Sequence, residues 1–320
     1  MGRLAIKIIA IIFILFHLNI NLFSQQNKNI NFVNKYKGGY IYYITSDDNK
    51  YLYIGEDEYF KILDVSNPSV PKALGKTQLT KSNMSHIFKI IPKDSFAYIV
   101  GNDALYIINM IDPNNLNISG YLQLPLIARD VAIFDQYAFI ANLHMLNIVN
   151  IKNPYSPTYI ASIPNLWCKF VTIKNNILFV LGHALVLFKI NNSINYLSDC
   201  ILPINRPSGL IIKDNLAFVT DLDSGLTIID FSEIEKPNII KKFYSSKFRS
   251  IKSIAIRDKF LFMLVEKNIV RVMNFINPLE PFEVGYYEIE GIGEGLTVFQ
   301  NYIYVCAGYN GLYILKFNTK

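Results

Sequence analysis

A short aromatic-rich segment recurs seven times along the chain at nearly constant spacing, and this periodicity limits the possible folds more than any other feature. Its copies are Tyr51–Tyr53, Phe96–Tyr98, Tyr137–Phe139, Ile177–Phe179, Leu216–Phe218, Phe260–Phe262 and Tyr302–Tyr304. The middle residues of consecutive copies lie between 39 and 45 residues apart. Periods of about 20–50 residues are typical of repeat proteins, in which similar units pack side by side. We therefore expect a series of similar units.

Each unit predicts four short antiparallel strands. After a turn, the aromatic segment is followed by a run rich in β-branched residues, such as LTIIDF at 226–231. Dipeptides such as Asn153-Pro154 end that run, because proline cannot donate to a strand ladder. An outward strand such as TYIASIP (158–164) and the more apolar opening strand of the next unit follow. Four-stranded units at this period are typical of β-propeller blades.

The two ends of the chain are expected to share the last blade. The seventh unit ends at Lys320 just after its third strand, and Asn31–Tyr36 can supply the missing fourth. Sharing of this kind leaves no open edge in the ring. The predicted fold is therefore all-β, a seven-bladed propeller of four-stranded antiparallel blades over residues 25–320. Its blades are expected at about 40–80, 84–125, 127–164, 167–203, 206–245, 249–290, and 292–318 with 30–37.

The first 24 residues have the pattern of a secretory signal peptide. Arg3 and Lys7 precede an unbroken apolar run, Ile8–Phe16, that is too short to span a bilayer comfortably. Cleavage after Ser24 would leave an exported protein in the periplasm or at the cell surface. The alternative is an uncleaved anchor over residues 4–23, which would be the only contact with a membrane.

Charge and cysteine content restrict the remaining function classes. The formal charge of +6 falls to +4 without Arg3 and Lys7, which is a mild surplus on a domain of this size. No dense basic stripe alternates with stacking aromatics, so we expect no nucleic-acid partner. Cys168, Cys200 and Cys306 lie near apolar strand sequence and are expected to be buried without a bridge.

The repeat units resemble the LVIVD repeat. The features that carry the resemblance are the Ala-aromatic strand, a G-L-x-I-I-D strand and the S-N-P stop, seen over 129–163, over 209–243 and in LDVSNP at 63–68. Asn191-Asn192 replaces the Asn-Pro stop in one degenerate unit. The resemblance covers most of residues 40–318. It implies an exported β-propeller of bacterial and archaeal cell surfaces, and it implies no reaction or catalytic residue.

One position near the start of the opening strands suggests a binding site. In successive units it reads Phe88, Arg129, Lys169, Ser208, Lys252 and Glu294. Because the opening strands of a propeller surround its channel, these residues predict a polar, net-basic channel mouth that binds an anionic group. The candidate ligand-binding residues are Arg129, Asp130, Lys169, Ser208, Lys252 and Glu294. The alternative is a solvated ring around a water-filled channel, in which Asp130 pairs with Lys169.

No metal or other cofactor is expected. His144 and His183 fall in turns, and no spacing supplies the further ligands that a metal needs. Asp221 and Asp223 begin like a calcium loop, but the glycine is misplaced and Ser232 stands where a glutamate is required. A hairpin turn ending at Gly225 is the expected structure there.

Two classes of function remain open. Without a catalytic motif, the preferred hypothesis is a non-catalytic binding or scaffolding propeller of the cell envelope or cell surface, whose partner is a protein or a glycan. The alternative is a hydrolase or lyase acting on an anionic substrate. In that case Arg129, Lys169 and Lys252 would bind the anion, and Glu294 or Asp130 would act as general base.

Overall fold

The computed structural model describes residues 27–47, 50–81, 86–102, 104–191 and 193–318. The predicted signal segment, residues 1–24, lies outside the described residues. Nearly all regular structure in these ranges is β, with one 3-10 turn, η1 (Glu266–Asn268). None of the helical structure in the same ranges is long and apolar enough to cross a membrane.

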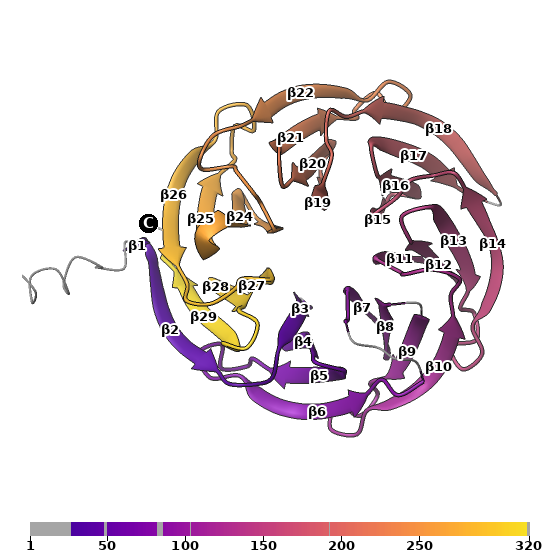
Figure 1. Ribbon diagram of the computed structural model, residues 1–320, viewed down its shortest axis with the longest axis horizontal. Helices are drawn as coiled ribbons and strands as arrows, with labels where there is room; N and C mark the ends of the chain where they lie inside the picture. The colour runs from indigo at the N-terminus through magenta and orange to yellow at the C-terminus, as the bar shows by residue number, and fades with distance from the viewer. Residues whose placement is uncertain (1–26, 48–49, 82–85, 103, 192, 319–320) are drawn as a thin grey trace, which may run out of the picture.

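Seven antiparallel sheets stand side by side in a ring around a central channel (Figure 1), which confirms the predicted seven-bladed propeller. From the channel outward, blade 1 contains β3 (Ile41–Ser46), β4 (Tyr51–Glu56), β5 (Tyr59–Asp64) and β6 (Lys72–Gln78). Blade 2 contains β7 (Lys89–Lys93), β8 (Phe96–Gly101), β9 (Ala104–Asn109) and β10 (Asn117–Gln123). Blade 3 contains β11 (Asp130–Phe134), β12 (Tyr137–Ala141), β13 (Met145–Asn150) and β14 (Thr158–Pro164).

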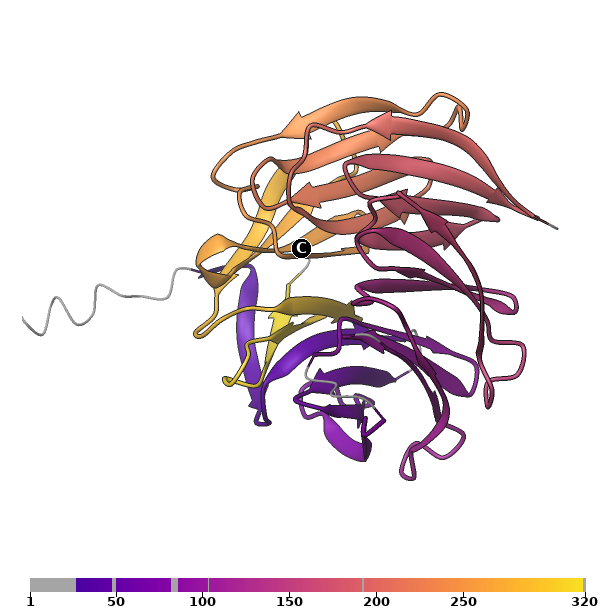
Figure 2. The same cartoon turned by 45° about the vertical axis from the view of Figure 1, so that its right-hand side comes forward.

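The remaining four blades, coloured from magenta to yellow in Figure 2, complete the ring. Their strands follow the same order from the channel outward. Blade 4 contains β15 (Phe170–Lys174), β16 (Ile177–Leu181), β17 (Ala184–Ile190) and β18 (Ile194–Ile201). Blade 5 contains β19 (Pro207–Lys213), β20 (Leu216–Asp221), β21 (Gly225–Asp230) and β22 (Asn238–Phe243). Blade 6 contains β23 (Ser253–Arg257), β24 (Phe260–Val265), β25 (Ile269–Asn274) and β26 (Phe282–Glu288). Blade 7 contains β27 (Gly295–Phe299), β28 (Tyr302–Cys306), β29 (Leu312–Phe317) and, as its outermost strand, β2 (Ile30–Tyr36).

The N-terminal strand β2 closes the ring as predicted. It pairs with β29 in antiparallel register, from Ile30 opposite Phe317 to Tyr36 opposite Leu312. In every blade the register between the third and the outermost strand shifts once. The register of β2 shifts between Phe32 and Asn34, as the register of an outermost strand does elsewhere in the ring. Such irregularities increase local twist, so β2 has the local geometry of the strand that it replaces.

A further strand, β1 (Asn27–Lys28), was not predicted. It pairs with β26 and gives blade 6 a fifth strand. Residues 27–36 therefore bridge blades 6 and 7. The pairing rests on main-chain groups of only two residues, which is why no side-chain pattern in the sequence indicated it.

Packing between blades explains the aromatic repeat. The middle residue of each aromatic segment is fully buried: Leu52, Ala97, Ala138, Leu178, Ala217, Leu261 and Ile303. Each apolar cluster joins two consecutive blades. Tyr53 and Phe60 of blade 1, for example, pack with Ala97 and Tyr106 of blade 2. Burial of apolar area between neighbouring sheets is the main source of stability here, at about 25 cal/mol per Å².

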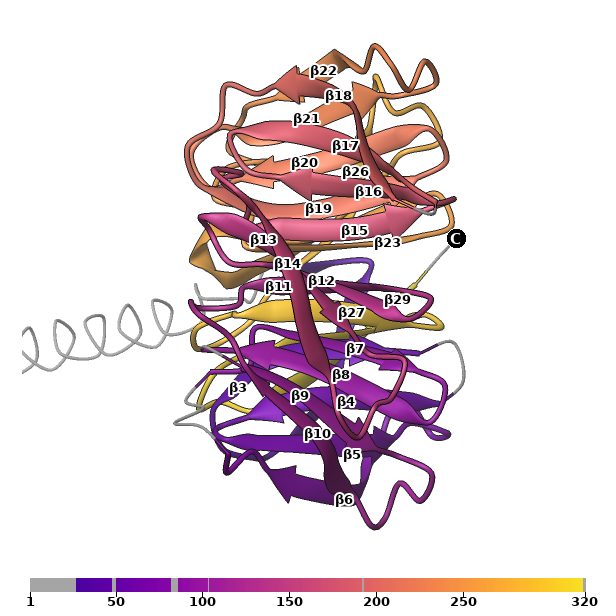
Figure 3. The same ribbon diagram turned by 90° about the vertical axis from the view of Figure 1, so that its right-hand side faces the viewer.

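The ring has two distinct faces. Seen from the side, the strands run between these faces and the loops lie at both of them (Figure 3). The inner strands all begin at one face, where the second strands end. Lys89 at the start of β7, for example, pairs with Val100 near the end of β8. We call this the upper face and the opposite one the lower face.

Candidate ligand-binding site at the upper channel mouth

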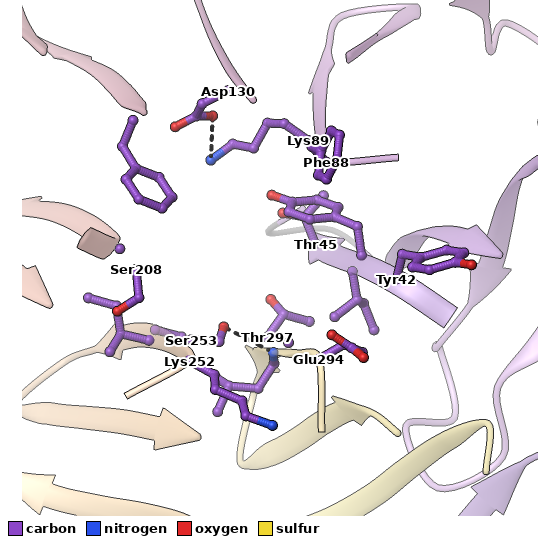
Figure 4. Close-up of a pocket in the computed structure, with 18 of the residues that line it drawn as sticks. Tyr42, Thr45, Phe88, Lys89, Asp130, Ser208, Lys252, Ser253, Glu294 and Thr297 are labelled. Atoms are coloured by element: carbon purple, nitrogen blue, oxygen red, sulfur yellow. Dashed lines mark hydrogen bonds and ion pairs between the residues drawn. The ribbon is translucent and has the colours of Figure 1, made fainter. Parts of the chain in front are cut away.

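A cavity of about 600 Å³ occupies the channel (Figure 4). Residues from the inner strands of all seven blades line it, as predicted for these strands. Of the predicted site residues, the structure places Asp130, Ser208, Lys252 and Glu294 on the cavity wall. Arg129 and Lys169 are not among the lining residues. They directly precede the lining residues Asp130 and Phe170.

The aligned position identified in the sequence forms a ring at the upper mouth. The backbone N–H groups of Phe88, Arg129, Lys169, Lys252 and Glu294 each donate to a carbonyl of the adjacent second strand, at distances of 2.8–2.9 Å. These five residues therefore occupy equivalent places, one residue before the inner strand. Ser208 differs because the register of β19 shifts between Pro207 and Gly209, and its hydroxyl donates to Thr220 Oγ1 at 3.0 Å.

Asp130 forms an ion pair with Lys89, and the expected pairing with Lys169 is wrong. Lys89 Nζ lies 3.2 Å from Asp130 Oδ1. The same carboxylate accepts the backbone N–H groups of Val131 at 2.9 Å and of Val171 at 3.0 Å. Asp130 thus connects blades 2, 3 and 4 in the channel wall, while Lys169 is directed toward blade 5.

The environment of this pair shifts both pKa values. Burial raises the pKa of Asp130, and the Lys89 ammonium and the two N–H donors oppose that effect. Burial also lowers the pKa of Lys89, but the charge of Asp130, the neighbouring Tyr43 and the hydrogen bonds to both together outweigh it and hold the lysine pKa above its usual value. Three donors, the Lys89 ammonium and two backbone N–H groups, thus compensate in part for the burial of this carboxylate.

The three cations at the upper mouth bind neutral groups. Lys169 Nζ donates to Pro207 O at 2.7 Å and Lys252 Nζ donates to Gly293 O at 3.2 Å, each on the next blade. The Arg129 guanidinium carbon lies 4.4 Å from the centre of the Phe88 ring, and its Nε has no hydrogen-bond partner among the described residues. Within the described part of the chain, none of the three lies within 4.0 Å of a carboxylate oxygen.

Burial and mutual repulsion affect these cations. Burial lowers the pKa of Arg129. Burial and, to a smaller extent, the charge of Arg129 lower the pKa of Lys169, and the charge of Asp221 acts in the opposite direction. An anion placed beside Arg129 and Lys169 would relieve this repulsion, so the geometry favours binding of a negatively charged group.

An arc of aromatic rings completes the mouth, and sequence reasoning missed it. Tyr42 lies 4.4 Å from Tyr40 and 4.4 Å from His86 between ring centres, and Tyr309 lies 4.8 Å from Tyr40. His86 in turn stacks on Phe88 at 6.0 Å. The available signal was the tyrosine-rich run GGYIYY at 38–43, which we assigned to the start of blade 1 without a role.

Glu294 is hydrogen-bonded to one of these rings, Tyr40. The hydroxyl of Tyr40 donates a hydrogen bond to Glu294 Oε1. That bond, followed by burial, raises the pKa of Tyr40 well above its usual value. Blade 7 and the connection leading into blade 1 are therefore joined at the mouth, and the carboxylate of Glu294 is already engaged.

The other sequence candidates have structural roles. Asp221 accepts the backbone N–H groups of Arg206 at 2.6 Å, Asp223 at 2.8 Å and Ser224 at 2.7 Å, which confirms the hairpin turn expected there. His183 stacks on Trp167 with ring centres 4.0 Å apart. In the ranges that the structure describes, no group of three or more His, Cys, Asp or Glu side chains is placed to hold a metal ion.

Comparisons with known proteins agree with this architecture. The family model of the LVIVD repeat matches residues 48–77, 127–163 and 208–244, which fall in blades 1, 3 and 5. No curated protein sequence matches the chain.

Solved structures show the fold alone, because their sequences are so different. The Pan2 WD40 domain of Neurospora crassa is 9% identical with a TM-score of 0.71, and the match covers 88% of this chain and 90% of that domain. The β-propeller domain of Cps50 (Swd1) from Myceliophteria thermophila is 10% identical with a TM-score of 0.75, covering 90% and 99%. The computationally designed Ika8 protein is 9% identical with a TM-score of 0.63, covering 89% and 98%.

Proposed function

We propose that this chain, a seven-bladed propeller that contains LVIVD repeats, is an exported, non-catalytic binding protein of the cell envelope or cell surface. Its partner, a protein or a glycan, is recognised at the upper channel mouth. The observation that carries this proposal is the set of cations at that mouth, Arg129, Lys169 and Lys252, which are held by neutral groups beside an arc of aromatic rings.

The rigidity of the mouth supports a role in binding. Lys169 and Lys252 are each held to the next blade by a hydrogen bond to a carbonyl, and Arg129 is packed on Phe88 of the preceding blade. Side chains that are fixed before a ligand arrives lose little conformational freedom when it binds. A small number of convergent polar groups around a concave, partly aromatic site is typical of ligand-binding sites.

The geometry favours binding over the hydrolase or lyase alternative. A general base needs an accessible carboxylate with a suitable pKa. Asp130 is enclosed by Lys89 and two N–H donors and is 3% exposed, and Glu294 accepts a hydrogen bond from Tyr40. Asp130, one of the two candidate general bases, is therefore not placed to accept a proton from a substrate, and one oxygen of the other candidate, Glu294, is already engaged.

The proposal that the protein is exported depends on the N-terminal sequence alone, because residues 1–26 lie outside the described residues. We expect the protein recovered from its host to begin at Gln25, and intact-mass measurement after fractionation of the cells tests this. A mass that includes residues 1–24 would support the anchored alternative.

Binding at the upper face can be tested with two matched lysines of one strand. Lys169 directly precedes β15 and Lys174 ends it, and each donates to a carbonyl of blade 5, Pro207 O at 2.7 Å or Asp214 O at 2.9 Å. The full chain, Lys169→Ala and Lys174→Ala are used as bait with a detergent-solubilised envelope fraction, and captured proteins and glycans are both identified. We expect a saturable partner with wild type and Lys174→Ala and its loss with Lys169→Ala. Equal capture by both variants, or none by wild type, would contradict the proposal.

A further inference from the structure

Exposed apolar side chains lie in the connections of the upper face: Ile127, Ile201, Tyr244, Ile292 and Tyr309. The connections of the lower face carry exposed apolar side chains as well, such as Ile111 and Ile276. The strand register places the first group at the upper face. Ile201 pairs with Ala184 beside the turn of blade 4, and Tyr244 follows Phe243, which pairs with Leu226 beside the turn of blade 5. Ile201 is 80% exposed and Ile292 is 59% exposed.

Aliphatic side chains at this face favour a protein partner over a glycan. The isoleucine side chain offers no hydrogen-bonding group to a sugar hydroxyl. The free energy that it contributes to binding comes from the removal of apolar area from water. Apolar residues gathered on one surface, in contact with polar groups, are typical of protein–protein binding sites.

The charge of the mouth indicates what such a partner presents. The lower mouth also carries cations, and there Lys174 and Lys213 donate to the backbone carbonyls of Asp214 and Asp258. Arg257 lies 3.9 Å from the carboxylate of Asp258. At the upper mouth, no carboxylate oxygen of the described residues lies within 4.0 Å of Arg129, Lys169 or Lys252, so a negatively charged partner would complement them.

The shape of the cavity restricts the form of the partner. Its lining continues from the mouth to residues farther along the inner strands, among them Ile211. Thr45 and Thr297 also belong to this lining (Figure 4). A cavity of about 600 Å³ between seven blades admits an extended segment and excludes a folded domain.

From these observations, and resting on the proposed function, we infer that the upper face docks a protein through an extended acidic segment. Carboxylates of that segment lie among Arg129, Lys169 and Lys252. Apolar side chains of the same partner cover Ile201, Tyr244 and Ile292. The acidic groups supply selectivity and fast association, and the apolar contacts supply most of the affinity.

The test uses a random-peptide phage library panned on the full chain. We expect enriched peptides to combine Asp or Glu with Leu, Ile or Val. A synthetic, fluorescein-labelled copy of the leading peptide should bind at least about tenfold more weakly to Lys169→Ala and to Ile201→Ser, and more weakly as salt increases. Lys174→Ala and Ile276→Ser are the matched controls at the lower face, where Ile276 is 73% exposed, and should bind as wild type does.

The outcomes separate this inference from the proposal on which it rests. Enriched peptides without acidic residues, or binding that Lys169→Ala leaves unchanged, would overturn the inference. A second result would also overturn it: no peptide binds, whereas an oligogalacturonate binds wild type and does not bind Lys169→Ala. The upper face would then be a glycan-binding site. If the envelope partner is captured equally by Lys169→Ala and Lys174→Ala, the proposed function itself fails. Thermal melts of all four variants establish that they are folded.

Discussion

Lys89 and Asp130, the first residues of the inner strands of blades 2 and 3, form an ion pair across the boundary between these blades, with 3.2 Å between Nζ and Oδ1. Removing two charges from water is costly, and it is tolerated only where geometry and further hydrogen bonds compensate. Here the compensation comes from the N–H groups of Val131 and Val171, so one carboxylate holds the inner strands of blades 2, 3 and 4 together.

Substitution Asp130→Asn should therefore be strongly destabilising. It leaves the Lys89 ammonium without its counter-charge and presents an amide N–H group to the backbone donors, so we expect a loss of about 3 kcal/mol in the free energy of unfolding. Urea denaturation followed by tryptophan fluorescence measures it.

The double variant Lys89→Met/Asp130→Leu is the control for this prediction. It replaces both charges by apolar groups, and it should recover part of the loss because no unpaired charge remains, although the N–H groups of Val131 and Val171 lose their acceptor. A double variant that is as unstable as Asp130→Asn would show that the charge pairing itself is unimportant.

The same pair predicts a loss of stability in alkali. The folded state holds the pKa of Lys89 above its usual value, although burial alone would lower it. The folded protein therefore binds this proton more tightly than the unfolded chain does. Its contribution is fully present below the unfolded lysine pKa of about 10.4 and is lost as pH rises above that value. In denaturation series across this range, Lys89→Met should lose less stability with pH than wild type, and identical slopes would contradict the assignment.

The sequence predicted those parts of the fold that depend on periodic burial. Leu52, Ala138 and Leu261 are fully buried because each is the middle residue of a repeated strand, and a spacing near 40 residues is visible without any structure. Closure by the N-terminal strand was equally predictable, since a ring with one unpaired edge is unfavourable.

The site was predicted less completely, because its contacts cross blade boundaries. The repeat aligned Arg129, Lys169 and Lys252, but nothing in it indicates that Asp130 turns toward Lys89 and not toward Lys169. The hydrogen bond between Tyr40 and Glu294 joins residues 254 positions apart, which only closure of the ring brings together. Sequence periodicity identifies positions that are equivalent in different blades. Contacts between non-equivalent positions depend on side-chain rotamers and on the local twist of the sheets, which the periodicity does not specify.

Closure by β2 predicts different costs for two neighbouring residues. Ile30 is fully buried against Phe317 and other apolar residues of blades 6 and 7, whereas Phe32 on the same strand is 47% exposed. Ile30→Ala should lower the free energy of unfolding by about 3 kcal/mol, because it leaves a cavity at the seam of the ring. Phe32→Ala should cost less than about 1 kcal/mol. Thermal or urea unfolding of both variants measures this, and equal costs would show that β2 does not seal the core.

The buried thiols provide a probe of the ring that needs no substitution. Cys168 is fully buried, its Sγ lies 3.1 Å from Met145 O, and burial raises its pKa to about 11. At pH 7 about one thiol in ten thousand would then be ionised, and only the thiolate reacts quickly with alkylating agents. Cys200 and Cys306 are also buried and unpaired, and burial raises the pKa of each. We expect iodoacetamide at pH 7 to leave all three unmodified in the folded protein and to label all three in urea, as read by intact mass. Rapid labelling of Cys168 under native conditions would mean that the connection between blades 3 and 4 opens far more readily than its packing indicates.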